Sequence, residues 1–198
     1  SFAELEKIIR RGDIGAVEMC TVISRDPSPP PAEYVKGSGG IFADMMIHDF
    51  DMARFLVGEE FVVVNALGAA LVDKAIGEAG DVDTAAVQMQ TASGKIAVIT
   101  NSRRATYGYD QRMEVHGSKG MVHAKNVHNT TVEVLSDKGY LADPIHNFFL
   151  ARYGAAYAND LKTFMTAVET GNRDLKPNAF DGLQVHNLAA GVTHSLKL

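Results

Sequence analysis

The sequence predicts an α+β domain in which a large, open and mainly antiparallel sheet has helices packed on one face. Three observations predict this class: a helical period near the start, a period of two with tight turns over about 61–135, and two helical segments at the end. Strands joined by tight turns pair antiparallel, and helices grouped before and after them pack on the sheet as a layer. We expect all 198 residues to form this one domain.

The first elements follow from apolar spacing and from chain breakers. Residues 2–11 have apolar side chains at helical spacing before a glycine, and residues 16–23 alternate around β-branched residues as a strand does. Four prolines within 27–31 make the next segment a stiff, extended loop. Residues 41–57 then keep a helical period up to a closing glycine.

The sheet is predicted as a meander of five or six strands. Residues 82–91 and 95–105 are two runs with a Ser-Gly turn between them, which is a strong hairpin signal. A second glycine-containing turn joins 109–116 to 121–125, and 131–135 adds a short strand. These strands are expected to lie side by side in chain order.

Two helices complete the prediction, at about 149–170 and 178–196, with Gly171 and Pro177 between them. Because the helices cover one face of the sheet, its other face is expected to meet solvent or a second copy of the chain.

Composition excludes several classes of partner. The net charge of −5 and the pI near 5.8 offer no electrostatic footprint for nucleic acid or an anionic membrane. The longest apolar stretch, 61–72, falls short of the ~20 residues of a membrane span, and the N-terminus does not resemble a signal peptide. Cys20 is the single cysteine, so we expect a reducing, cytoplasmic setting.

The chain is also expected to lack its own dinucleotide-binding loop. Its one glycine cluster before a helix is 37–40, where the third glycine of a G-x-G-x-x-G pattern would fall at Phe42. That cluster follows the proline-rich loop instead of a strand.

The segment with candidate chemistry is the helix over 41–57. On a regular helix Asp44, His48 and Asp51 share one stripe. A carboxylate one turn from an imidazole in apolar surroundings can orient it as a general base. The same spacing fits a buried structural histidine. It also fits a metal site, although three ligands from one helix leave the coordination incomplete, and we expect no metal.

Five segments carry recognisable motifs. The longest is G-G-I-F-A-D-M-M-I-H-D-F-D-M-A-R at 39–54. The others are G-D-I-G at 12–15, R-D-P at 25–27, the strand pair over 101–112 and the E-V-H-G-S-K-G hairpin at 114–120. Together they resemble the Gfo/Idh/MocA oxidoreductases, and most closely their inositol dehydrogenase branch. The resemblance covers nearly the whole chain.

The resemblance implies a glyceraldehyde-3-phosphate dehydrogenase-like C-terminal domain, used for substrate binding and oligomerisation. It implies that the N-terminal Rossmann domain, which binds NAD or NADP, is absent from this chain. The full-length enzyme would oxidise a ring carbinol of a cyclitol to a ketone. By match, His48 takes the hydroxyl proton, Asp44 orients the imidazole, and a lysine of the Rossmann domain stabilises the oxyanion. The 198 residues alone are then expected to be inactive.

A polyol site needs several hydrogen-bonding side chains around an apolar floor. The candidates are Arg25 and Asp26 beside the proline loop, and Tyr107 and Tyr109, expected on one strand with the same side-chain parity. Two alternatives stay open: another sugar or polyol dehydrogenase of the family, and a non-catalytic oligomerisation module. In each case we expect a homodimer or homotetramer formed through the open sheet face.

Overall fold

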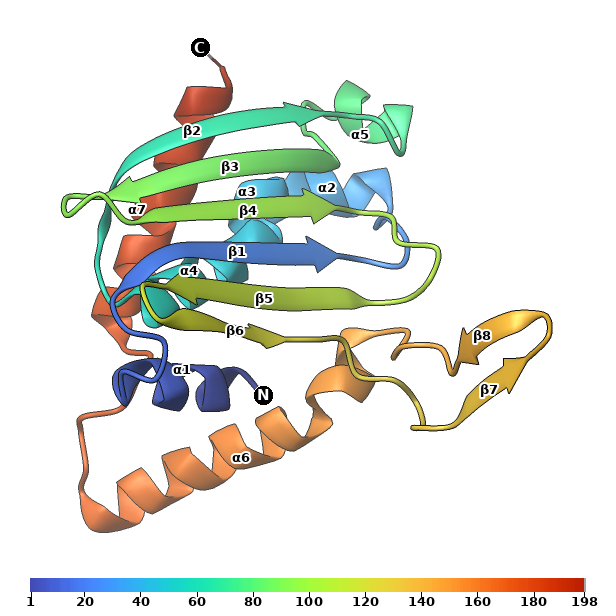
Figure 1. Cartoon of the computed structure of the whole chain (residues 1–198). Coiled ribbons are helices and arrows are strands. Elements are labelled where there is room, and N and C mark those ends of the chain that lie inside the picture. Colours follow the sequence, from blue (N-terminus) through green and yellow to red (C-terminus); the bar gives the residue numbers. More distant parts are fainter. Residues whose placement is uncertain (198) are drawn as a thin grey trace.

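The structure, a computed structural model, describes residues 1–197 and confirms the α+β class with a mainly antiparallel sheet (Figure 1). The order of the six strands is β2-β3-β4-β1-β5-β6. Their bounds are β1 Val17–Arg25, β2 Phe61–Ala69, β3 Thr84–Thr91, β4 Ile96–Ser102, β5 Asp110–Gly117 and β6 Gly120–Ala124.

The predicted continuous meander is wrong in two places, and the first is the position of β1. Strand β1 lies between β4 and β5, parallel to β4 and antiparallel to β5. The connection over 103–109 therefore passes the end of β1 instead of forming a hairpin. Cys20 and Val22 of β1 are fully buried, so the strand order is stabilised by apolar burial at the centre of the sheet.

One face of the sheet is covered by α4 (Met46–Val57) and α7 (Ala179–Leu196), as predicted (Figure 1). The core forms where the central strands meet these helices, with Val22, Ile99 and Phe50 all fully buried. Burial of each such side chain contributes roughly 1.5–3 kcal/mol. Asn178 caps α7 in a capping box with Asp181.

The predicted helix over 41–57 is divided into α3 (Ile41–Asp44) and α4 at Met45, whose φ and ψ are −106° and −58°. The start of α3 is held by Asp81, whose carboxylate accepts the Ile41 backbone N–H at 3.0 Å. Helix α4 is held separately on the sheet by the buried ring of Phe50. The two helices are therefore held by different contacts, and the chain bends between them at Met45.

Three short helices complete this part: α1 (Phe2–Arg10), which was predicted, and α2 (Ala32–Ser38) and α5 (Lys74–Glu78), which were not. Strand β7 (Glu133–Ser136) pairs only with β8 (Gly139–Ala142) in a separate hairpin, so the expected strand at 131–135 is not part of the main sheet.

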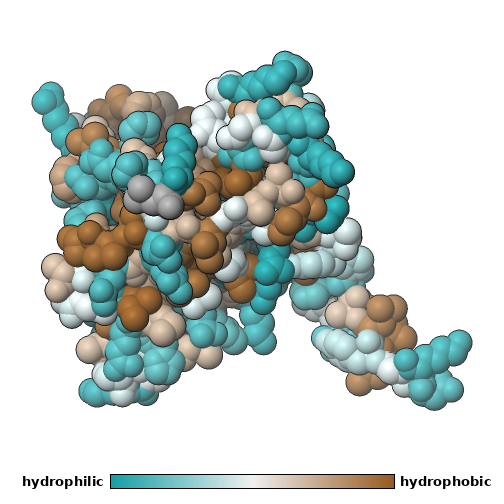
Figure 2. Space-filling view, turned by 90° about the horizontal axis from the view of Figure 1, so that it is seen from above, coloured by the Kyte–Doolittle hydropathy of each residue, from teal (hydrophilic) through white to brown (hydrophobic). Residues whose placement is uncertain are grey.

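Helix α6 spans Phe149–Thr170 as predicted, but it lies beside the sheet instead of packing across its face (Figure 1). Most of its length is exposed; Ala167 is its one buried residue. In the view of Figure 2, the hairpin β7–β8 projects away from the body of the molecule as an arm. No helix within residues 1–197 is long and apolar enough to cross a membrane.

Candidate active site

A cavity of about 1160 Å³ lies between α4, the ends of β1 and β5, and the first turns of α6. Part of its lining is polar and consists of two carboxyl groups and an imidazole, from Asp26, Asp44 and His48. Another part of the lining is aromatic, with Phe149 and Tyr153 of α6. A concave site with a few converging polar groups and an apolar wall is typical of a small-molecule pocket.

His48, in the first turn of α4, is exposed and lines this cavity. Its ring is therefore accessible to a ligand and is not a buried structural histidine. The helix break at Met45 places it on α4, one element after Asp44 on α3.

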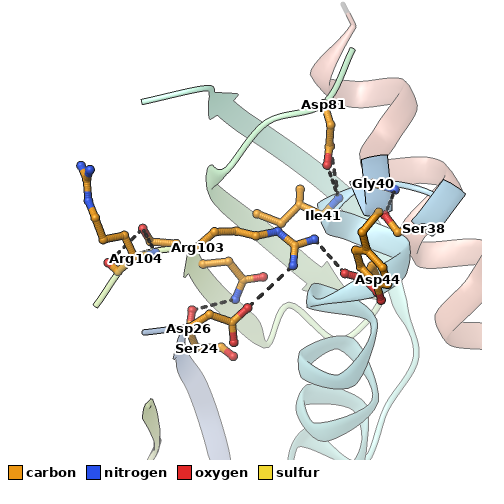
Figure 3. A network of polar contacts seen from close by, with 12 residues as sticks. Ser24, Asp26, Ser38, Gly40, Ile41, Asp44, Asp81, Arg103 and Arg104 are labelled. Carbon is orange, nitrogen blue, oxygen red and sulfur yellow. Dashed lines mark hydrogen bonds and ion pairs between the residues drawn. The ribbon is translucent and has the colours of Figure 1, made fainter. Parts of the chain in front are cut away.

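Asp44 contacts different partners from those its helical spacing suggested. Its Oδ1 accepts a hydrogen bond from the hydroxyl of Tyr34 at 2.6 Å. Its Oδ2 accepts one from Nη2 of Arg103 at 2.8 Å (Figure 3). The hydrogen bond from Tyr34 to Asp44 raises the pKa of the tyrosine. In the described residues Asp44 is thus fixed by Tyr34 and Arg103, not by a hydrogen bond to His48, because the break at Met45 ends the regular i, i+4 geometry.

Arg103 joins two of the candidate carboxylates. It is 3% exposed, and its Nη1 lies 3.7 Å from Oδ2 of Asp26 while Nη2 contacts Asp44 (Figure 3). Burial raises the pKa of Asp26, and the positive charge of Arg103 opposes that shift. The sequence alone did not assign Arg103 to the site, because a charge near the end of the strand predicted over 95–105 is more often an ordinary edge charge.

The structure separates the four predicted substrate-binding residues into two groups. Asp26 and Tyr109 line the cavity. Arg25 lies on the opposite face of the sheet, because it alternates with the buried Ser24 on β1, and its Nη1 donates to the hydroxyl of Tyr107 at 3.1 Å. The prediction that Tyr107 and Tyr109 point to the same side of one strand is wrong. Both residues precede β5 and belong to an irregular loop.

Within residues 1–197, no group of three or more His, Cys, Asp and Glu side chains is arranged to hold a metal ion. Asp51 is the third member of the helical stripe. Its Oδ1 lies 3.4 Å from Nη1 of Arg54.

Comparison with known proteins shows to which family the chain belongs. A family model described as the GFO/IDH/MocA C-terminal domain matches residues 2–123. The chain belongs to the Gfo/Idh/MocA family. It is 55% identical to the inositol 2-dehydrogenase of Rhizobium meliloti over 98% of this chain, and 51% identical to the myo-inositol 2-dehydrogenase of Thermotoga maritima over 86%.

Solved structures agree with this assignment. A myo-inositol dehydrogenase from Corynebacterium glutamicum is 44% identical, with a TM-score of 0.95 over the whole chain. A scyllo-inositol dehydrogenase from Lactobacillus casei, solved with NAD(H) and scyllo-inositol, is 28% identical, with a TM-score of 0.89 over 99% of the chain. This chain spans 59% of the Rhizobium protein and 51% of the Thermotoga protein, and 59% of each of these two structures.

Proposed function

We propose that this chain is the substrate domain of an NAD-dependent inositol 2-dehydrogenase, which oxidises a ring carbinol of a cyclitol to a ketone. One observation carries the proposal: His48 is exposed in a large cavity beside Asp26 and Asp44, and these two carboxylates share the buried cation of Arg103. The names of the relatives support inositol as the substrate class.

Each polar residue has a role in this proposal. His48 accepts the proton of the reacting hydroxyl, which requires an accessible neutral imidazole. Asp26 and Asp44 accept hydrogen bonds from ring hydroxyls, and Arg103 keeps both carboxyl groups in place through its ion pairs. The hydroxyl of Tyr109 donates or accepts a hydrogen bond at another hydroxyl of the cyclitol ring. Arg25 and Tyr107 have no part in this site, because they lie on the other face of the sheet.

The glycine cluster at 37–40 does not offer a site for the pyrophosphate of a dinucleotide. The glycine cluster before α3 is already closed by a carboxylate: Asp81 accepts the Ile41 N–H, and a Cβ added at Gly40 would lie 2.8 Å from Asp81 Oδ1. We therefore propose that NAD is held mainly by a Rossmann domain outside this chain, in a protein of the cytoplasm. When bound, NAD⁺ supplies the hydride acceptor. These 198 residues alone are then expected to show no turnover.

The test is a rate measurement on the full-length protein with NAD⁺ and myo-inositol, scyllo-inositol and glucose in parallel. His48→Ala should lower kcat at least ~100-fold, the usual size of a general-base effect. His116→Ala is the matched control, since His116 is an exposed histidine on β5, outside the cavity. Unchanged turnover after His48→Ala would show the domain to be a non-catalytic association module, and a clear preference for glucose would reassign the substrate.

We also propose that the open sheet face joins two copies into a dimer or tetramer. The face opposite α4 and α7 exposes large apolar side chains, among them Leu67 (70% exposed) and Val63 (53%). Apolar exposure on this scale is commonly covered in an assembly.

A further inference from the structure

A buried polar network forms part of the floor of the cavity, which Asp49, Ser24 and Gln111 line. Asp49, the residue after His48, is 2% exposed and turns toward the sheet, while His48 is exposed. Consecutive helical residues lie about 100° apart around the axis, so the orientation of one determines that of the other. Asp49 shares its burial with three polar side chains from three strands: Ser24, Asn101 and Gln111.

The contacts of Asp49 tie α4 to those strands. Nδ2 of Asn101 on β4 donates to Oδ2 of Asp49 at 2.7 Å and also to the backbone carbonyl of Ser24 at 3.3 Å. Nε2 of Gln111 on β5 donates to Oγ of Ser24 at 2.5 Å. The hydroxyl proton of Ser24 is thereby left to face Asp49, and this interaction acts to lower the pKa of the carboxyl. The carboxyl thus interacts with two neighbouring strands, through a hydrogen bond from Asn101 and through Ser24.

Burying this carboxyl is costly. Burial raises the pKa of Asp49 to about 7; the hydrogen bonds from Asn101 and Ser24 oppose the rise, and the charge of Asp26 adds to it. The other titratable groups that face it are Tyr109 before β5 and Tyr153 of α6. An apolar side chain would fill such a position at lower cost if packing alone mattered.

We propose that Asp49 is a positioning residue for the reaction: its hydrogen bond from Asn101 and its interaction with Ser24 lock the rotation of α4 about its axis and so aim His48 into the cavity. The inference rests on the proposed function, because the readout is turnover through His48. Asp49 lines the cavity but is only 2% exposed, and in this role it acts through the helix that carries the base.

Asp49→Asn in the full-length enzyme tests this. Asparagine has the same shape but directs an amide donor toward a donor, so it cannot accept from both partners. We expect kcat to fall at least ~10-fold while the KM for NAD⁺ is unchanged, since a small misplacement of a catalytic group is enough for such a loss. Because burial raises the pKa of Asp49 to about 7, its titration should contribute to the acid limb of log kcat/KM against pH, and Asp49→Asn should lower the slope of that limb.

Asp83→Asn is the matched control. Asp83 is also fully buried and accepts several hydrogen bonds, from the backbone of Leu71, Val72 and Asp73, but it is outside the cavity. It should lower the melting temperature and leave kcat within about twofold of the parent. If Asp49→Asn behaves like Asp83→Asn, with a lower melting temperature but normal kcat and slope, the positioning role is wrong.

A second variant keeps the test open if Asp49→Asn does not fold. Ser24→Ala removes one donor to Asp49, so the charged carboxylate loses a stabilising bond and the acid limb should move to higher pH. An acid limb that stays in place contradicts the proposal. His48→Ala separates the two hypotheses: if it abolishes turnover while the Asp49 and Ser24 variants have no effect, only the positioning role fails; if it too is active, the proposed function fails.

Discussion

The two faces of the sheet carry similar polar residues at the same strand ends, yet only one face forms a candidate site. On the helical face, Arg103 bridges Asp44 and Asp26 at the edge of a cavity. On the open face, Asp110 is fully buried and accepts from its neighbours Tyr107, Arg112 and Asn126.

The difference lies in how far each carboxylate is satisfied. Burial acts to raise the pKa of Asp110, but the hydrogen bonds from Arg112, Tyr107 and Asn126 outweigh it and lower the pKa. For Asp26 burial prevails, and the pKa is raised. A saturated carboxylate stabilises the fold, whereas one with unused acceptor capacity beside a cavity can bind hydroxyl groups.

The largest contrast is expected between the two arginines. Arg103→Met should lower kcat/KM on the order of 100-fold, because two carboxylates lose a buried, charge-assisted partner. Arg112→Met on the open face should leave kcat/KM within about twofold and lower only stability. Steady-state kinetics and urea unfolding of both variants provide the check. Equal kinetic losses would mean that the two faces do not differ in function.

A smaller contrast is expected between the two tyrosines. Tyr109→Phe removes a hydroxyl that lines the cavity, so the KM for inositol should rise about 5–10-fold, the value of one hydrogen bond. Tyr107→Phe removes a hydroxyl bound to Arg25 and Asp110 and should leave that KM unchanged. Comparable KM values for the two variants would contradict the assignment of Tyr109 to the substrate.

The smallest effect on chemistry is expected from the apolar part of the open face. Leu67→Asp should dissociate the assembly, since a buried, unpaired charge in an interface is unfavourable, while kcat per subunit changes by less than about threefold. Leu150→Asp, at a similarly exposed position on α6, is the control. Sedimentation of both proteins provides the measurement. If Leu150→Asp dissociates the assembly and Leu67→Asp does not, the interface lies on α6 instead.

Local sequence determined much of this protein. The helical period over 149–170 matches α6 residue for residue, and the Ser-Gly turn places β3 beside β4. The motif around Asp44 and His48 identified the family and two residues of the candidate site. These features depend on periods and turns that a few neighbouring residues set by themselves.

The tertiary structure alone decided which residues meet. It placed β1 between β4 and β5, paired Asp44 with Arg103 across 59 positions, and turned Arg25 and Tyr107 to the open face. It also divided the predicted helix at Met45, which separated Asp44 from His48. Strand order and contacts between distant residues depend on how the whole core packs, and no local period or turn encodes that.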